Sequence, residues 1–283
     1  MNRSRSATDP RRDPFSTISA VAIRFLIVDA LNLIRRVHAA TPEDKEPQHT
    51  EAARNATVQS LKRALGHARP THVVAVFDGE GPTWRDKLYA DYKAGRKPMP
   101  EALRAALSSY RKSFSELGVA SVSKPALEAD DVVATLATKA AEHESEAIIL
   151  STDHAYCQLI SDHIALRDHF QKQDRDRGYV QKKFNVPPEQ LVDLWALAGS
   201  ASTHIPGVPG IGLKTAAKLL HEHESLSQVL EAAANMSGKL GNTLRENSDR
   251  ARMSRELSHL RRDLELGWNL KEFSLSPPTR ADD

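Results

Sequence analysis

The chain has 283 residues, of which 40% are hydrophobic and 27% are charged, and its formal net charge is +2. This composition is ordinary for a globular protein, and the length suits one large domain with a smaller one. Because the net charge is close to zero, any contact with nucleic acid depends on locally clustered basic side chains. The single cysteine, Cys157, excludes an internal disulfide and a cysteine-based zinc site and favours a reducing, cytoplasmic setting.

The sequence shows neither the pattern of a membrane span nor that of a secretory signal, and its first 22 residues have a different character. No apolar run approaches the roughly 20 residues of a membrane span, so no membrane partner is expected. Residues 1–22 are rich in Arg, Ser, Asp and Pro and lack the apolar core of a secretory signal. We predict a disordered tail there and assign it no function.

Short apolar, β-branched runs predict buried strands at residues 23–28, 73–77, 119–123 and 147–150. Helical patterns lie between them, at 30–34, 52–68, 101–117 and from 129 onward. This alternation predicts an open, parallel α/β sheet, in which the carboxyl ends of the strands form the ligand crevice. A further strand at 163–166 ends near Asp168, to which we assign a local role because Arg167 is adjacent.

Each of the first four strands leads to carboxylates. Negative charge at a helix start is explained by the helix dipole alone, but three acids within one turn repel one another without a cation or basic partner. Oxygen ligands in the absence of cysteine favour Mg²⁺ or Mn²⁺ over zinc. The sequence therefore predicts a divalent-metal site on one rim, formed by Asp29, Asp78, Glu128, Asp130, Asp131 and Asp153.

Residues 79–100 interleave aromatic and basic side chains, a mixture that suits phosphate contact and base stacking. The alternative is a solvated basic loop whose aromatic rings pack inward. The position directly after Asp78, beside the acids, favours a substrate role. The side chains are Trp84, Arg85, Lys87, Tyr89, Tyr92, Lys93, Arg96 and Lys97.

The polar stretch 171–178 predicts a boundary between domains at 23–180 and 181–283. The second domain contains no strand pattern and is expected to be helical, with helices at 187–198, after 213, at 226–234 and at 240–264. The glycine-rich run 205–212 predicts a tight turn that exposes N–H groups at a helix N-terminus, a phosphate-binding arrangement to which Lys214 adds charge. A generic Gly/Pro turn between helices is the alternative.

Taken in order, these motifs resemble the flap endonuclease and 5′-nuclease family from about residue 24 to the end. The residues 25–36 look most similar to a short bacterial branch of that family. The motifs that carry the resemblance are Asp29 after the first strand, Val76-Phe77-Asp78-Gly79, Tyr92-Lys93-Ala94-Gly95-Arg96, Glu128-Ala129-Asp130-Asp131, Ser151-Thr152-Asp153 and the Pro206 to Gly212 run.

The resemblance implies a PIN-like three-layer α/β/α nuclease domain followed by a helix-three-turn-helix DNA-binding domain. It implies a monomeric, Mg²⁺-dependent phosphodiesterase that cuts 5′ flaps in branched DNA during replication or repair. Asp130 would be the direct metal ligand, and Lys93 and Arg96 would stabilise charge on the phosphate. It also implies a K⁺ ion bound by the main-chain carbonyls of Leu197, Ala198, Pro206, Val208 and Ile211. The implied DNA contact comprises Gly210, Ile211, Gly212, Leu213, Lys214 and Thr215.

The chain departs from the family pattern at three positions. Ala155, Ser200 and Thr203 stand where the family usually has acids, so three carboxylates of a second metal site are absent. Their loss weakens direct coordination of a second Mg²⁺. The short bacterial branch shares the loss, which implies a subgroup trait. Two alternatives remain open: a DNA-junction-binding protein with little nuclease activity, and a PIN-type ribonuclease.

Overall fold

The computed structural model describes residues 23–42 and 45–275; the predicted tail at 1–22 lies outside the described residues. A six-stranded sheet with the order β3-β2-β1-β4-β5-β6 organises the first domain. All neighbouring strands pair in parallel except β5 and β6, which form an antiparallel hairpin. The strands are β1 (Arg24–Asp29), β2 (His72–Val76), β3 (Ala120–Val122), β4 (Glu146–Leu150), β5 (Ile164–Asp168) and β6 (Gln173–Arg175).

The five predicted strands are confirmed to within a few residues. The sixth, β6, was missed because its Gln-Asp-Arg sequence carries no apolar pattern, and it occupies the stretch that we predicted as a domain boundary. Within the described residues, no helix is both long and apolar enough to cross a bilayer.

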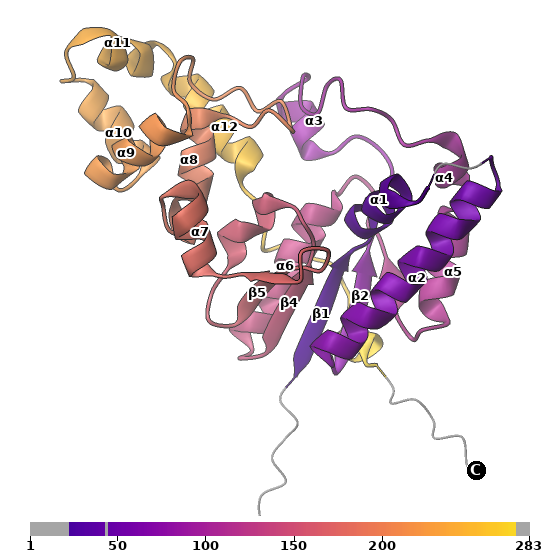
Figure 1. Cartoon of the computed structure of the whole chain (residues 1–283). Coiled ribbons are helices and arrows are strands. Elements are labelled where there is room, and N and C mark those ends of the chain that lie inside the picture. The colour runs from indigo at the N-terminus through magenta and orange to yellow at the C-terminus, as the bar shows by residue number, and fades with distance from the viewer. Residues whose placement is uncertain (1–22, 43–44, 276–283) are drawn as a thin grey trace, which may run out of the picture.

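Side chains along β1 alternate between two cores, as a strand buried on both faces requires. Phe25 and Ile27 pack against α6, whereas Leu26 and Val28 pack against α1, α2 and α5. The sheet is therefore the middle of three layers (Figure 1), and the predicted fold class is confirmed. The flanking helices are α1 (Ala30–Ala40), α2 (Gln48–Ala68), α4 (Glu101–Ala105), α5 (Leu107–Ser115) and α6 (Ala129–Glu142). The single helix predicted at 101–117 is divided into α4 and α5.

The carboxyl ends of the strands meet at one edge of the sheet. The order of the strands reverses around β1, since β2 lies on one side of it and β4 on the other. Such a switch point leaves a crevice at the strand ends. The short helix α3 (Trp84–Leu88) and the helical domain both stand above this edge (Figure 1).

The second domain is helical, as predicted. Helix α7 (Arg177–Phe184) spans the predicted boundary, and after it come η2 (Pro188–Gln190), α8 (Leu191–Ala198), α9 (Leu213–His223), α10 (Leu226–Ala233), α11 (Gly238–Glu246) and α12 (Ser248–Ser258). The long helix predicted at 240–264 is wrong, because the chain leaves helical geometry at Asn247 and again at His259. Leu260 and Leu264, which fall within this predicted helix, belong to an extended segment instead.

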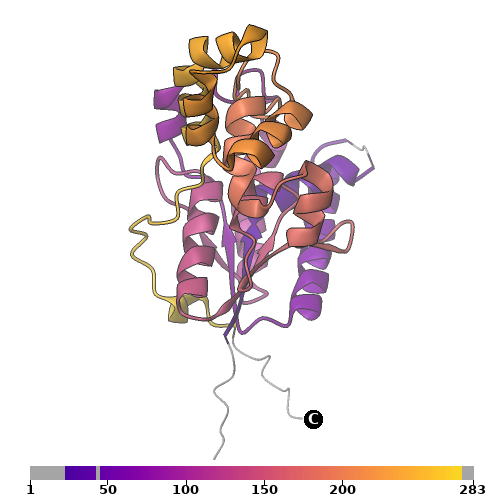
Figure 2. The ribbon, with the colours of Figure 1, turned by 90° about the vertical axis from the view of Figure 1, so that its left-hand side faces the viewer.

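We call residues 259–275 the C-terminal strap, because they run back along α6 to the sheet (Figure 2). Thr135 Oγ1 donates to the carbonyl of Arg261 at 3.2 Å, and Lys139 Nζ donates to that of Leu264 at 3.1 Å. Near the end of the strap, within η3 (Leu270–Phe273), the ring of Phe273 stacks on that of Phe25 with centroids 5.7 Å apart. The second domain is therefore tied to the first at two distant points along the chain.

Candidate active site

The carboxylates at the strand ends are held by backbone N–H groups at the starts of helices. Asp29 caps α1 and accepts from the backbone N–H of Asn32 at 3.1 Å. Asp78 accepts from the N–H of Ala129 at 2.8 Å, at the start of α6. Asp153 opens the 3₁₀ helix η1 (His154–Leu159), where it accepts from the N–H of Ala155 at 2.8 Å. Each of these three side chains therefore lies at or just past the end of a strand and is fixed by an N–H group at the start of a helix.

Four of the six predicted acids line one pocket of about 130 Å³ at this edge: Asp29, Asp78, Asp130 and Asp153. Lys93 and Arg96 from the 79–100 segment line the same pocket, as the sequence predicted. Arg35 and Arg36 also line it, and sequence reasoning missed both because the pattern of their helix does not show which of its polar side chains turn toward the strand ends.

Asp131 and Glu128 do not line this pocket, and the structure gives each a different role. Both oxygens of Asp131, which is fully buried, accept from the guanidinium of Arg85, at 2.8 and 2.9 Å. Trp84 Nε1 and the N–H of Arg261 also donate to Asp131, at 2.8 and 3.0 Å. The prediction of Asp131 as a metal ligand is therefore corrected: its lone pairs serve an internal ion pair.

Glu128 is shared by two cations. Its Oε2 accepts from Arg85 Nη1 at 2.6 Å, and its Oε1 accepts from Lys93 Nζ at 2.5 Å. The close spacing of three acids at the start of α6 thus has the basic partners that mutual repulsion requires. Glu128 thus holds Lys93 at the rim of the pocket, and each of its two oxygens accepts a hydrogen bond from a basic side chain.

The remaining acids repel one another inside the protein. Burial, together with the charge of Asp130, raises the pKa of Asp29 to about 8, and the same two causes raise the pKa of Asp153. Burial opposes the charge on Lys93, but the neighbouring Asp130 and Glu128 outweigh it and raise the pKa of that ammonium. The pocket therefore holds a protonated lysine beside carboxylates that favour a further cation.

Tyr156 is a member of the site that sequence reasoning missed. Its buried hydroxyl donates to Asp130 Oδ1 at 2.8 Å and lies 3.3 Å from Asp29 Oδ2. Ser151 Oγ donates to the same oxygen of Asp29 at 3.0 Å. A tyrosine within an apolar stretch carries no signal of such a role.

The donor set fits a hard divalent ion that keeps much of its water. In the part of the chain described, no three His, Cys, Asp or Glu side chains are arranged to hold one ion directly. Mg²⁺ is commonly bound through one or two carboxylates and several waters, so the arrangement of Asp130 beside Asp29, Asp78 and Asp153 suits it. Zinc, which prefers sulfur and nitrogen ligands, would find neither among these four side chains.

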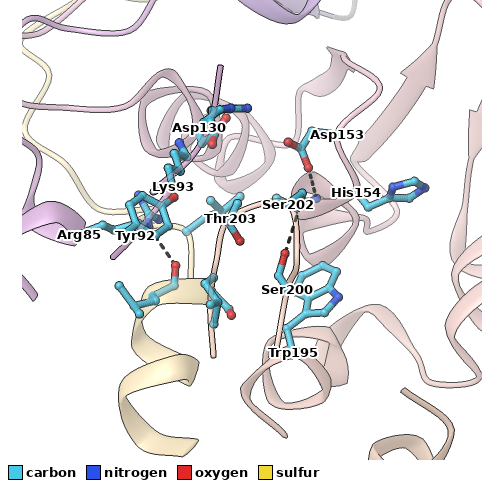
Figure 3. Close-up of a pocket in the computed structure, with 16 residues that line it drawn as sticks. Arg85, Tyr92, Lys93, Asp130, Asp153, His154, Trp195, Ser200, Ser202 and Thr203 are labelled. Atoms are coloured by element: carbon cyan, nitrogen blue, oxygen red, sulfur yellow. Dashed lines mark hydrogen bonds between the residues drawn. The ribbon is translucent and has the colours of Figure 1, made fainter. Parts of the chain in front are cut away.

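A second pocket, of about 190 Å³, adjoins the first and lies between the rim and the helical domain (Figure 3). Ala155, Ser200 and Thr203 line it, together with Ser202, whose hydroxyl lies 3.2 Å from that of Ser200. Asp130 and Asp153 are the acids that line it among the described residues. The positions expected to lack second-site carboxylates therefore face this pocket with a methyl group and hydroxyls.

The segment 79–100 combines the two interpretations that the sequence left open. Tyr92 is buried against Ile205 and Leu257, and the ring of Trp84 lies under the guanidinium of Arg85, 4.4 Å from its centroid. Arg96 is exposed at the pocket. Lys93 and Arg96 thus face the rim, whereas Arg85 and these two aromatic rings pack inward, so the rings are not free to stack on bases.

The glycine-rich hairpin brings two backbone segments into contact. Gly199, with φ +73°, ends α8, and the N–H of Val208 donates to the carbonyl of Leu197 at 2.8 Å. A Cβ on Gly207 would lie 2.3 Å from the backbone nitrogen of Gly199, so only glycine permits this approach. Leu197 O and Val208 O each accept one backbone hydrogen bond, which leaves one lone pair on each carbonyl.

The N-terminus of α9 follows this hairpin. Gly212 is its N-cap residue and no side chain caps the first turn. Lys214 and Thr215 are exposed there. Uncapped N–H groups beside a lysine are a favourable place for a phosphate.

Comparison with known proteins decides the family. Residues 24–185 match the model of the 5'-3' exonuclease N-terminal resolvase-like domain, and residues 186–281 match that of the 5'-3' exonuclease C-terminal SAM fold. The chain belongs to the 5'-3' exonuclease family. The predictions of the family and of a nuclease enzyme are confirmed.

Individual relatives agree with this assignment. The chain is 43% identical over 259 residues to "Flap endonuclease Xni" of Aeromonas hydrophila subsp. hydrophila, covering 90% of this chain and 97% of that protein. It superposes on T5 5'-exonuclease with zinc ions bound, with a TM-score of 0.70, 20% identity and coverage of 84% and 89%. A bacteriophage T5 flap endonuclease complex with DNA and metal ions gives a TM-score of 0.69 at 20% identity, with the same coverage. The two T5 structures establish a shared fold.

Proposed function

We propose that this 5'-3' exonuclease family member is a Mg²⁺-dependent flap endonuclease that hydrolyses a phosphodiester bond near the base of a 5′ flap in DNA. The observation that carries the proposal is the convergence of Asp29, Asp78, Asp130 and Asp153 on one pocket with Lys93 and Arg96. Mn²⁺ would substitute, since both ions prefer oxygen ligands. The 43% identity to a protein named flap endonuclease Xni supports the choice of a flap as substrate.

The residues of the pocket would have two roles: the acids would bind a cation, and the basic side chains would bind the phosphate. The four acids would hold a divalent ion, which would supply a more acidic bound water and positive charge to offset that of the attacked phosphate. Asp130 would be the direct ligand, and Asp29, Asp78 and Asp153 would act directly or through water. Lys93, held by Glu128 at 2.5 Å, and the exposed Arg96 would grip the scissile phosphate and stabilise the charge that develops on it.

The helical hairpin would hold the duplex at a fixed distance from the pocket. The carbonyls of Leu197, Ala198, Pro206, Val208 and Ile211 would hold a K⁺ ion, which would supply positive charge for binding DNA phosphate. The contact would comprise Gly210, Ile211, Gly212, Leu213, Lys214 and Thr215. Phosphate contacts fix orientation without reading sequence, so cleavage would follow junction geometry. Such an activity fits replication or repair, carried out by a monomer in the cytoplasm.

The test is cleavage of a labelled 5′-flap duplex by the purified protein. With Mg²⁺ we expect a product at the flap base, and with EDTA or with Asp130→Ala we expect none. A wild-type protein that binds the flap duplex but yields no more product than Asp130→Ala would instead be a junction-binding protein. That outcome is the alternative that the hydroxyl-lined second pocket favours, because it offers few carboxylates for another ion. Preferential cleavage of single-stranded RNA would identify a PIN-type ribonuclease.

A further inference from the structure

Arg85, on α3, is 1% exposed, and its guanidinium is fully used. All five of its N–H groups donate hydrogen bonds, the complete capacity of an arginine. Two bonds go to Asp131 and one to Glu128, both at the start of α6. The other two go to the main-chain carbonyls of Leu257, at 2.9 Å, and His259, at 2.8 Å, where α12 ends and the C-terminal strap begins. One side chain therefore joins three parts of the fold.

The bond to Glu128 connects Arg85 to Lys93. Glu128 Oε2 is fixed by Arg85 Nη1 at 2.6 Å and by the hydroxyl of Tyr92 at 3.2 Å, which leaves Oε1 directed at Lys93 Nζ, 2.5 Å away. Glu128 is buried, so it has few other orientations once both oxygens are bound. The position of the Lys93 ammonium thus depends on Arg85, although the two cations make no hydrogen bond to each other.

The bonds to Leu257 and His259 connect the same arginine to the DNA-binding hairpin. Ser254, one turn earlier on α12, accepts from the N–H of Gly207 at 3.2 Å through its hydroxyl. The hairpin also reaches Lys93 directly, since the N–H of Lys93 donates to the carbonyl of Thr203 at 2.9 Å. Contacts therefore run without interruption from the hairpin through α12, Arg85 and Glu128 to Lys93.

We propose that Arg85 is a positioning residue, which sets the place of Lys93 in the active site through Glu128 and fixes it relative to the helical DNA-binding domain. Lysine cannot replace it, because an ammonium has three donors and lacks the planar fork that serves two carboxylates and two carbonyls at once. The inference deepens the proposed nuclease function and rests on it.

The decisive experiment compares Arg85→Lys in two backgrounds, wild type and Lys93→Ala. Single-turnover cleavage of a labelled 5′-flap duplex at saturating Mg²⁺ gives the rate, and fluorescence anisotropy in Ca²⁺ gives the Kd. We expect Arg85→Lys to lower the rate about 10- to 100-fold, since a small misplacement of a catalytic group has effects of that size. The Kd should change less than about threefold. Adding Arg85→Lys to Lys93→Ala should not lower the cleavage rate further, because the effects of substituting residues that act as a unit are not additive.

Arg175→Lys is the matched control. Arg175 is 4% exposed and donates to Asp168 at 2.7 Å and to one carbonyl, but it touches neither Glu128 nor Lys93. Arg175→Lys should lower the melting temperature as Arg85→Lys does. It should not cause the loss of cleavage rate that depends on Lys93. If Arg85→Lys does not fold, Tyr92→Phe replaces it, since it removes the other bond to Glu128 Oε2 and retains the ring.

The possible outcomes separate this inference from the proposed function. If the wild-type protein does not cleave the flap duplex, the proposed nuclease function is wrong and so is the positioning role. If the wild type cleaves, three results for Arg85→Lys would overturn the positioning role and leave the proposed nuclease function standing. They are an equal loss of cleavage rate in both backgrounds, an unchanged cleavage rate, and a loss of DNA affinity without a loss of rate.

Discussion

The hydroxyl of Tyr156 lies 2.8 Å from Asp130 Oδ1 and 3.3 Å from Asp29 Oδ2, so one buried phenol bridges two carboxylates of the rim. Burial and the charge of Asp130 hold the pKa of this phenol well above its ordinary value. Tyr156 therefore remains a hydrogen-bond donor throughout the physiological range. It fixes one oxygen of Asp130, and no hydrogen bond within the described residues engages the other.

We predict that Tyr156→Phe raises the Mg²⁺ concentration for half-maximal cleavage about 10-fold or more, because outer partners of metal ligands have effects of that size. The fold should survive, since the ring is retained. Titration of cleavage rate against Mg²⁺ measures the change. Tyr110→Phe is the control, because Tyr110 is equally buried on α5 across the sheet. An unchanged Mg²⁺ requirement in Tyr156→Phe would remove the tyrosine from the metal site.

The raised pKa of Asp29 predicts that the metal-free protein loses stability as the pH rises. The folded protein keeps a proton on Asp29 up to about pH 8, while the unfolded chain loses it near the ordinary value of 3.8. Between these values the folded state binds more protons, so the free energy of unfolding falls with pH, by at most about 1.4 kcal/mol per pH unit for one carboxyl. Asp29→Asn should remove most of this slope and stabilise the metal-free protein at pH 8.

Melting temperatures in EDTA across pH 5 to 9 test the prediction, with the wild type and Asp29→Asn side by side. Excess Mg²⁺ should restore stability to the wild type at pH 8 and do little for the variant. A wild-type stability that rises steadily with pH in EDTA would contradict the proposed crowding of carboxylates.

At the N-terminus of α9, we predict that Lys214→Ala weakens DNA binding about equally for all sequences and lowers the salt slope by roughly one unit. The same helix provides a control one turn later. Lys218 is exposed and lies 3.8 Å from Glu222, so Lys218→Ala should leave the slope nearly unchanged. Binding isotherms at several salt concentrations measure both variants, and equal slopes for Lys214→Ala and the wild type would exclude a phosphate contact there.

The hairpin gives a prediction about monovalent ions. K⁺ should tighten flap-DNA binding more than Na⁺, and Gly207→Ala should abolish the difference, because its Cβ would collide with the backbone of Gly199 and displace the carbonyls. Gly238→Ala is the control, since Gly238 has φ +79° but nothing within 4 Å of an added Cβ. Equal affinities of the wild type in K⁺ and Na⁺ would contradict the proposed ion site.

The sequence predicted most of what depends on neighbours along the chain. The apolar runs located the strands, and each strand end carried its acid to the shared edge, so Asp29, Asp78 and Asp153 could be placed without coordinates. The ion pairs could not be predicted in this way. Arg85 Nε binds a carbonyl 172 residues later, and no local pattern indicates that Asp131 would turn toward it while Asp130 stays at the pocket.

The error at 240–264 has a related cause. Leucines at three- and four-residue spacing suit a helix, but Leu260 is buried in the extended strap, where it packs in the core beside α6. The regular spacing of apolar residues indicates that their side chains are buried, but it does not indicate the surface against which they pack.

The C-terminal strap also limits how the protein can be divided. A fragment that stops at residue 185 would lack the N–H of Arg261 that binds Asp131, the carbonyls that saturate Arg85, and the ring that covers Phe25. The four acids of the pocket would all be present, yet the buried Arg85 would be left with two hydrogen-bond donors unmatched. Excision of the nuclease half at the domain junction should therefore give an unstable polypeptide, and the two domains are best regarded as one folding unit.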